Sequence, residues 1–248
     1  MQRWTPAYFA EKVGHRRVTV DDAEYTVSEL LALIESSTPE NPAPYLRAQK
    51  LVEVLPELAP DLEPMISDAR PNWAESRLLP SSIRRARLPE ILLGGRGAGF
   101  HVLHYDKAHL HAFISQLYGL KDLFIFSPEQ TPRLYPKESA PNQSSVNIHT
   151  PDLVRHPLFA DAEMQVTTLK PGDTVYVPPG WWHTTLMNET SITVTWNMVG
   201  ASNWADFSAD TRSRVASRTN QAVAGALGAY LGLFGVGARL RDRLVGSG

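Results

Sequence analysis

The chain has 248 residues, a formal net charge of −2 and no cysteine. This length suits one sizeable β-barrel or sandwich domain, or two small domains, and the lack of cysteine excludes disulfides, thiolate-bound zinc and cysteine nucleophiles. The small net charge gives no electrostatic reason to expect nucleic acid or a membrane as a partner. The first residues, Met1 to Pro6, lack the basic and apolar segments of a signal peptide, so we expect a cytoplasmic protein.

The first region, residues 1–87, is expected to be a leader of helical and mixed structure that packs on the rest of the chain. Residues 18–27 contain β-prone valines and a tyrosine, and residues 28–34 begin with a serine that suits a helix N-cap before a leucine-rich run. A proline-rich loop follows. After it, the sequence predicts another helix from Tyr45 to about Leu55.

The central region, residues 88–200, reads mostly as strands. Residues 113–118, 123–126 and 191–196 are rich in β-branched and aromatic side chains, and glycine and proline separate them. Many short strands with such turns predict a mainly β domain, a sandwich or jelly-roll barrel, with flanking helices. One long polar and proline-rich interruption spans residues 130–162. A connection of that length usually carries function, for instance as a lid or substrate wall.

The last region, residues 201–248, is expected to be a helical tail. It contains an uncharged run of small residues from Ala222 to Ala238 with several glycines. The run predicts a helix that packs on its own barrel, with a homodimer through the tail as the second interpretation. A membrane span is disfavoured because the run is short and rich in glycine.

Candidate metal ligands lie in two segments far apart in the sequence: His104-Tyr105-Asp106, and the run from Pro171 to His183. In a strand, alternation places His104 and Asp106 on one face, and His183, at the end of an apolar strand, can add a third ligand. Two imidazoles and one carboxylate suit non-haem Fe(II), although Mn, Co, Ni and Zn can occupy the same ligands. Either segment alone is a weak signal, but together in a barrel-like pattern they predict a metal site.

With these segments, and with Gly119-Leu120-Lys121 and Asn197, residues 88–200 resemble the JmjC, cupin-like family of Fe(II)- and 2-oxoglutarate-dependent oxygenases. The likeness is closest to the hydroxylase branch that includes factor inhibiting HIF. The resemblance implies a double-stranded β-helix that binds Fe(II) through the two histidines and the aspartate. It also implies that Lys121 pairs with the distal carboxylate of 2-oxoglutarate and that Asn197 lies near this cosubstrate.

The sequence departs from the family pattern at two places. His101 stands where the family often has a threonine or serine that binds the cosubstrate, so we include His101 among the candidate cofactor-binding residues. His111-Ala112 stands where the family commonly has an asparagine, and the spacing from His104 to Gly119 is longer by about two residues. Because His104, Asp106 and His183 are intact, these departures indicate a changed pocket rather than an inactive enzyme.

The resemblance implies a hydroxylase that uses O₂, converts 2-oxoglutarate to succinate and CO₂, and oxidises a C–H bond of a protein, peptide or small molecule. The absence of thiolate-zinc modules favours hydroxylation over demethylation. Two alternatives stay open. One is a cupin-type metalloenzyme that does not use 2-oxoglutarate, and the other is a degenerate cupin that serves as a non-catalytic binding module.

Overall fold

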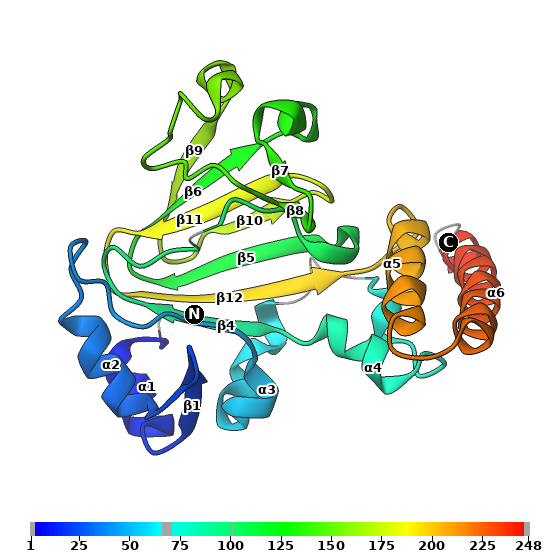
Figure 1. Ribbon diagram of the computed structural model, residues 1–248. Coiled ribbons are helices and arrows are strands. Elements are labelled where there is room, and N and C mark those ends of the chain that lie inside the picture. The colour runs from blue at the N-terminus through cyan, green and yellow to red at the C-terminus, as the bar shows by residue number, and fades with distance from the viewer. Residues whose placement is uncertain (1–2, 66–70, 101, 246–248) are drawn as a thin grey trace.

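The computed structural model describes residues 3–65, 71–100 and 102–245. In this part of the chain, a five-stranded antiparallel sheet and a three-stranded antiparallel sheet form the core of the molecule. Figure 1 shows the two sheets stacked, with α1 and α2 under the larger sheet and α5 and α6 beyond one end of it. This arrangement confirms the predicted mainly β jelly-roll with flanking helices.

The larger sheet has the strand order β10-β5-β12-β4-β3, and the smaller sheet has the order β11-β6-β9. The strands of the larger sheet are β3 (Leu46–Lys50), β4 (Glu90–Gly94), β5 (His111–Tyr118), β10 (Thr174–Val177) and β12 (Ser191–Met198). Those of the smaller sheet are β6 (Lys121–Phe126), β9 (Gln165–Leu169) and β11 (Trp182–Met187). Two further hairpins pair β1 (Arg17–Val20) with β2 (Ala23–Thr26) and β7 (Pro136–Lys137) with β8 (Ala140–Ser144).

Helices lie against the outer face and beyond one end of the larger sheet, and 3-10 turns occur in several of the connections. The α-helices are α1 (Pro6–Val13), α2 (Val27–Glu35), α3 (Leu51–Val54), α4 (Ser81–Arg84), α5 (Trp204–Ala216) and α6 (Gln221–Val245). The 3-10 segments include η1 (Pro56–Met65), η3 (Trp73–Glu75), η4 (Arg85–Arg87), η5 (Lys107–His109), η6 (Pro128–Arg133) and η7 (Pro157–Asp161).

The two faces of β12 show how the sequence separates core from site. Ile192, Val194 and Trp196 are buried in the large apolar cluster that the larger sheet shares with α1 and α2. The alternate residues Thr195 and Asn197 face the space between the sheets and line a cavity there. Because side chains alternate along a strand, one eight-residue segment supplies an apolar outer face and a polar inner face.

The leader differs from the prediction at one element and in one detail. The helix expected from Tyr45 to Leu55 is instead β3, which pairs with β4, followed by the short α3. The exposed edge of β4 explains the difference, because pairing in the sheet outweighs weak helix propensity. The second helix begins at Val27, since Thr26 rather than Ser28 caps it in a reciprocal capping box with Glu29.

The tail is helical, as predicted. One face of α6 packs with Trp73, Trp204 and Phe207 in a second apolar cluster through Leu231 and Ala238. The other face exposes large apolar side chains, namely Val223, Tyr230, Leu233, Val236, Leu240 and Leu244. By length and composition, Gln221–Leu244 could cross a membrane, with a mean hydropathy of 1.4 and 22% of its most apolar window buried in the molecule. Helix α6 thus extends beyond the uncharged run from Ala222 to Ala238, whose short length had disfavoured a membrane span.

Candidate metal centre

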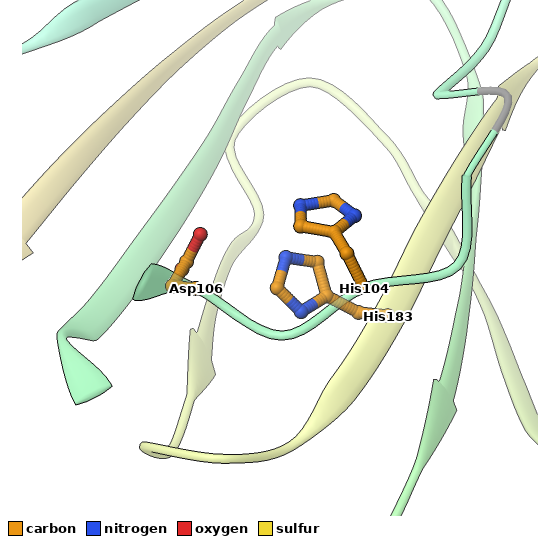
Figure 2. A group of neighbouring side chains, drawn as sticks. All are labelled: His104, Asp106 and His183. Carbon is orange, nitrogen blue, oxygen red and sulfur yellow. The ribbon is translucent and has the colours of Figure 1, made fainter. Parts of the chain in front are cut away.

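The structure brings His104, Asp106 and His183 together. One ligand atom from each side chain lies within 4.8 Å of the others, which is the geometry of a group that can hold a metal ion. Figure 2 shows the two imidazole rings next to each other with the carboxylate of Asp106 beside them. The ring centroids of His104 and His183 are 4.6 Å apart. Two imidazoles and one carboxylate on one side leave the other coordination positions open.

Both imidazoles are oriented by the backbone. The Nδ1 atom of His104 lies 2.9 Å from the carbonyl oxygen of Val102, and that of His183 lies 3.1 Å from the carbonyl oxygen of Trp181. A carbonyl only accepts hydrogen bonds, so each Nδ1 carries the proton and each Nε2 keeps its lone pair. This is the tautomer that a metal requires of an Nε2 ligand.

The segment that carries His104 and Asp106 is not the regular strand that was predicted. It pairs through a single bridging residue, His104, which lies between His183 of β11 on one side and Gln143 of β8 on the other. The backbone amide of His104 donates to the carbonyl of His183 at 3.1 Å, and the reverse bond is 2.7 Å. Residues 102–106 therefore depend on their neighbours for their conformation.

The long connection of residues 130–162 contributes one of those neighbours. It contains the hairpin of β7 and β8, and the side-chain amide of Asn142 donates to the carbonyl of Tyr105 at 3.0 Å. The amide of Tyr105 donates in return to the carbonyl of Asn142 at 3.1 Å. A loop expected to act as a lid or wall thus supports the metal-ligand segment directly. His149 and His156 pack on the rings of Phe124 and Tyr135 instead of joining the triad.

His183 was predicted at the end of the strand that follows Pro171-Gly172. In the structure it lies instead near the start of the next strand, β11. Strand β10 ends at Val177, and Pro178-Pro179-Gly180 turns the chain before β11 begins at Trp182. Proline cannot donate to a sheet, and Gly180 has a φ of 79°, which glycine adopts without strain. The turn moves His183 from the larger sheet to the smaller one, opposite His104.

The environment of the triad keeps His104 neutral. Burial lowers the pKa of His104 well below its ordinary value, and the neighbouring His183 lowers it further, while Asp106 acts in the opposite direction. Phe100 stacks on the His104 ring with a centroid distance of 4.7 Å and supplies part of this dry environment. A neutral imidazole can bind a metal without first losing a proton.

Lys121 lines the same cavity as the triad, at the start of β6. Only 1% of this residue is exposed, and burial lowers the pKa of its ammonium group to about 7. Gly119, whose φ is 71°, makes the tight turn before β6, and a Cβ there would meet the carbonyl oxygen of Thr190 at 1.8 Å. The turn therefore requires glycine, and it directs the lysine between the sheets.

A buried polar network holds the Lys121 side chain. Its Nζ donates to Thr193 Oγ1 at 2.5 Å, and that hydroxyl donates to Gln116 Oε1 at 2.8 Å. The amide nitrogen of Gln116 donates in turn to Ser191 Oγ at 2.8 Å and to two backbone carbonyls. Every member of the network is neutral except the lysine, so the ammonium group has an acceptor there but no anion. Burying a cation in this way is costly without a charged partner.

The remaining cofactor candidates fall in three places. Asn197 lines the cavity from β12, and its carbonyl accepts a hydrogen bond from the Asn72 side chain at 2.9 Å. His101 lies outside the described residues. Ala112 faces the cavity, whereas His111 points away, between the Tyr176 hydroxyl at 2.6 Å and the Ser202 hydroxyl at 2.9 Å.

The 3-10 segment η5 follows the first two candidate ligands directly. Ala108 and His109 have φ values of 61° and 47°, in the left-handed region that few residues other than glycine adopt. Such strained residues persist where the surrounding structure determines their conformation, often at functional sites. This turn follows Asp106 directly and connects it to β5, where Ala112 reaches the cavity.

Sequence reasoning missed several cavity residues. Glu90, Thr184 and Thr195 line the cavity, and the only signal was their alternation with apolar residues in predicted strands. Thr185 also lines the cavity, and its buried hydroxyl group interacts with the buried phenol of Tyr45. Burial raises the pKa of Tyr45 well above its ordinary value, so this phenol stays protonated and remains a donor.

The chain is similar to known proteins over much of its length. Residues 3–199 match the family model of the cupin-like domain. Lysine-specific demethylase 8 of Xenopus tropicalis is 28% identical over 199 residues, which are 74% of this chain and 41% of that protein. HSPB1-associated protein 1 of Bos taurus is 37% identical over 106 residues, or 41% of this chain and 21% of that protein.

A third relative is lysine-specific demethylase JMJ21 of Arabidopsis thaliana, 27% identical over 216 residues, which are 81% of this chain and 22% of that protein. The chain therefore spans less than half the length of these curated relatives. They support the wider JmjC and cupin-like grouping. They do not single out the narrower likeness to factor inhibiting HIF that the sequence motifs indicated.

Proposed function

This chain belongs to the cupin-like domain family, and on that premise we propose that it is an Fe(II)- and 2-oxoglutarate-dependent oxygenase. The proposed reaction hydroxylates a C–H bond of a protein, peptide or small molecule. One observation carries the proposal: the His-Asp-His cluster and the buried Lys121 line a single cavity. One end of this cavity offers a metal site, and the other offers the Lys121 ammonium group, which has no anionic partner. Together they fit a dicarboxylate that chelates the metal.

The residues fit the groups that the family implies. His104 and His183 present their Nε2 lone pairs, and Asp106 adds a carboxylate, so these three side chains would hold Fe(II). Lys121 would bind the distal carboxylate of 2-oxoglutarate through a charge-assisted hydrogen bond. When bound, the metal and cosubstrate supply activation of O₂ coupled to decarboxylation, which yields succinate and CO₂.

The protein's own contribution is orientation and exclusion of water. The Thr193 hydroxyl donates its proton to Gln116, so it can only accept a hydrogen bond from the Lys121 ammonium group. The other hydrogens of the ammonium group are then available to a ligand in the cavity. Phe100, Leu92 and Ile114 line the space between the ends with apolar surface. A dry wall around an oxidant prevents its loss in side reactions.

The test is succinate formation by the purified protein with Fe(II), ascorbate and 2-oxoglutarate, for the wild type and for His104→Ala and Lys121→Ala. Turnover that is lost in His104→Ala and weakened in Lys121→Ala would support the oxygenase. Metal binding without 2-oxoglutarate binding would favour a cupin metalloenzyme of another kind. Failure to bind either would favour a non-catalytic binding module. Gain of one oxygen atom by a substrate, rather than loss of a methyl group, would distinguish hydroxylation from demethylation.

We also propose that the exposed face of α6 holds two copies of the chain together. Its exposed positions recur at alternating spacings of three and four residues, at Val223, Ala226, Tyr230, Leu233, Gly237, Leu240 and Leu244. This is the spacing of a coiled-coil seam. The double variant Leu233→Glu with Leu240→Glu should change a dimer to a monomer in light scattering, whereas Arg239→Glu, an exposed position off the seam, should not. An unchanged mass would contradict the dimer, and binding to lipid vesicles would favour a membrane instead.

A further inference from the structure

A groove separate from the metal cavity lies at the end of the larger sheet. It measures about 540 Å³ and lies between β3, α4, η4 and the two tail helices. Figure 1 shows α4, α5 and α6 gathered at the end of the larger sheet where β12 runs into α5. A groove of this size falls within the range of pockets that bind compact ligands or a few side chains.

The groove is cationic although the whole chain is slightly acidic. Its charged lining consists of Lys50, Arg85, Arg214 and Arg218, with no carboxylate among the lining residues. An adjoining hollow adds Arg84 and Arg87, whose buried Nε atoms have no hydrogen-bond partner in the described ranges. The carboxylates of Glu53, Glu90 and Asp210 pair with three of these six cations, and the excess of positive charge that remains attracts a partner of the opposite sign.

The geometry of these cations already suits carboxylates. Lys50 pairs with Glu90 at 2.7 Å, Arg214 pairs with Asp210 at 2.9 Å, and Arg85 pairs with Glu53. Arg218 is exposed and makes no ion pair with any described residue. A peptide carboxylate can therefore pair with Arg218 directly and can share the other arginines with their resident partners.

The floor of the groove is apolar. Ile83 and Phe207 belong to the buried cluster around Trp204, and Leu227 of α6 is packed against that cluster. An apolar floor beneath a cationic rim matches a polypeptide that carries both acidic and apolar side chains. The groove suits nucleic acid less well, because proteins bind nucleic acid mainly by neutralising many phosphates along an extended basic surface.

The groove is joined to the metal cavity through one ion pair. Lys50 lines the groove, Glu90 lines the metal cavity, and their side chains meet at 2.7 Å, with only 10% and 26% of them exposed. A chain lying in the groove would thus lie against this pair, one ion pair away from the metal cavity. The Lys50–Glu90 pair therefore forms part of the wall between the two cavities.

We propose that this groove binds an acidic segment of a polypeptide substrate and directs an adjacent residue into the metal cavity. The proposal rests on the oxygenase function proposed above and narrows its substrate class to polypeptides with Asp- and Glu-rich sequence near the oxidised residue. Recognition combines carboxylate pairing at the arginines with burial of an apolar side chain on the groove floor.

The test is fluorescence anisotropy of the full chain with a short labelled peptide of alternating glutamate and leucine. Controls are the same peptide with lysine for glutamate and a single-stranded oligonucleotide of similar charge. Arg218→Glu should weaken binding of the acidic peptide about fivefold or more, and added salt should weaken it further. Arg155→Glu, a matched charge change at an exposed loop arginine, should leave it unchanged.

Arg218→Gln, with its fold checked by circular dichroism, guards against a variant that simply unfolds. Equal binding by Arg218→Glu and Arg155→Glu would overturn the proposal, as would failure of the acidic peptide to bind. Tighter binding of the oligonucleotide, lost in Arg218→Glu, would overturn it in favour of nucleic acid. Because binding is measured with and without Mn(II) and 2-oxoglutarate, it is independent of turnover. Peptide binding without succinate formation would contradict the oxygenase alone, and succinate formation without peptide binding would contradict the groove alone.

Discussion

The metal end of the cavity rests on irregular backbone, whereas the Lys121 end rests on regular strands. His104 and Asp106 belong to a segment that pairs through one residue, and hydrogen bonds from β11 and β8 fix it. Lys121 and Thr193 instead lie within β6 and β12, where the strand register determines their direction. The metal end is thus organised by its neighbours' backbone. The lysine end is organised by a side-chain network that lacks only an anion.

The largest effect should come from removing a metal ligand. His183→Ala should lower metal affinity by more than about a hundredfold and abolish turnover, since loss of even an outer partner of a ligand costs 10–100-fold. Circular dichroism should show an intact fold, because the ligand side chains are not part of the apolar clusters. Titration with Mn(II) measures the affinity, and His149→Ala, a loop histidine outside the triad, serves as the control. Retained metal binding in His183→Ala would contradict the triad.

The second test replaces the cation at the other end of the cavity. Lys121→Met should weaken 2-oxoglutarate binding by roughly 30-fold, as expected for loss of a charge-assisted hydrogen bond of about 2 kcal/mol. It should leave metal affinity unchanged and should not lower the free energy of unfolding at neutral pH, because the buried ammonium lacks an anion. Calorimetry with 2-oxoglutarate and chemical denaturation provide the two measurements. Lys170→Met, which changes an exposed lysine, should alter neither 2-oxoglutarate affinity nor the free energy of unfolding. Equal loss of both ligands would show that the two ends are not separable.

The third test uses pH. The folded pKa of Lys121 is about 7, below the ordinary value of 10.5, so between these two values the unfolded chain binds more protons than the folded one. This lysine therefore makes the free energy of unfolding rise with pH from about 7 upward. A bound carboxylate favours the protonated lysine, so 2-oxoglutarate affinity should fall over the same range. Both dependences should disappear in Lys121→Met. A pH-independent affinity in the wild type would show that the lysine is charged without the cosubstrate.

The smallest effect should come from the hairpin that supports the metal segment. Asn142→Ala removes one side-chain hydrogen bond to the carbonyl of Tyr105. The expected result is a threefold to tenfold loss of metal affinity, which corresponds to roughly 1 kcal/mol. Asn147→Ala, in the same loop, removes a local turn contact and should leave metal affinity unchanged. Identical Mn(II) titrations for the two variants would show that the hairpin does not position the ligands.

The same contrast explains what could be predicted from the sequence. Alternation is a local property, so the strands 113–118, 123–126 and 191–196 were recognisable, and β12 sorts its residues between core and cavity as alternation requires. The approach of His104 to His183 is non-local. The sequence motifs predicted it, but the path through an isolated bridge and a proline turn was not visible. The strand β3, predicted as a helix, exists because β4 offers it an edge, which no local pattern records.

The support of the metal segment by β8 has one more consequence. The hairpin lies within the loop of residues 130–162, and its backbone is hydrogen-bonded to Leu103 and Tyr105, the two residues that flank His104. A molecule that displaces this loop would therefore shift His104 relative to His183 without contacting either side chain. Binding of a partner to this loop would thus be coupled to the position of a candidate metal ligand.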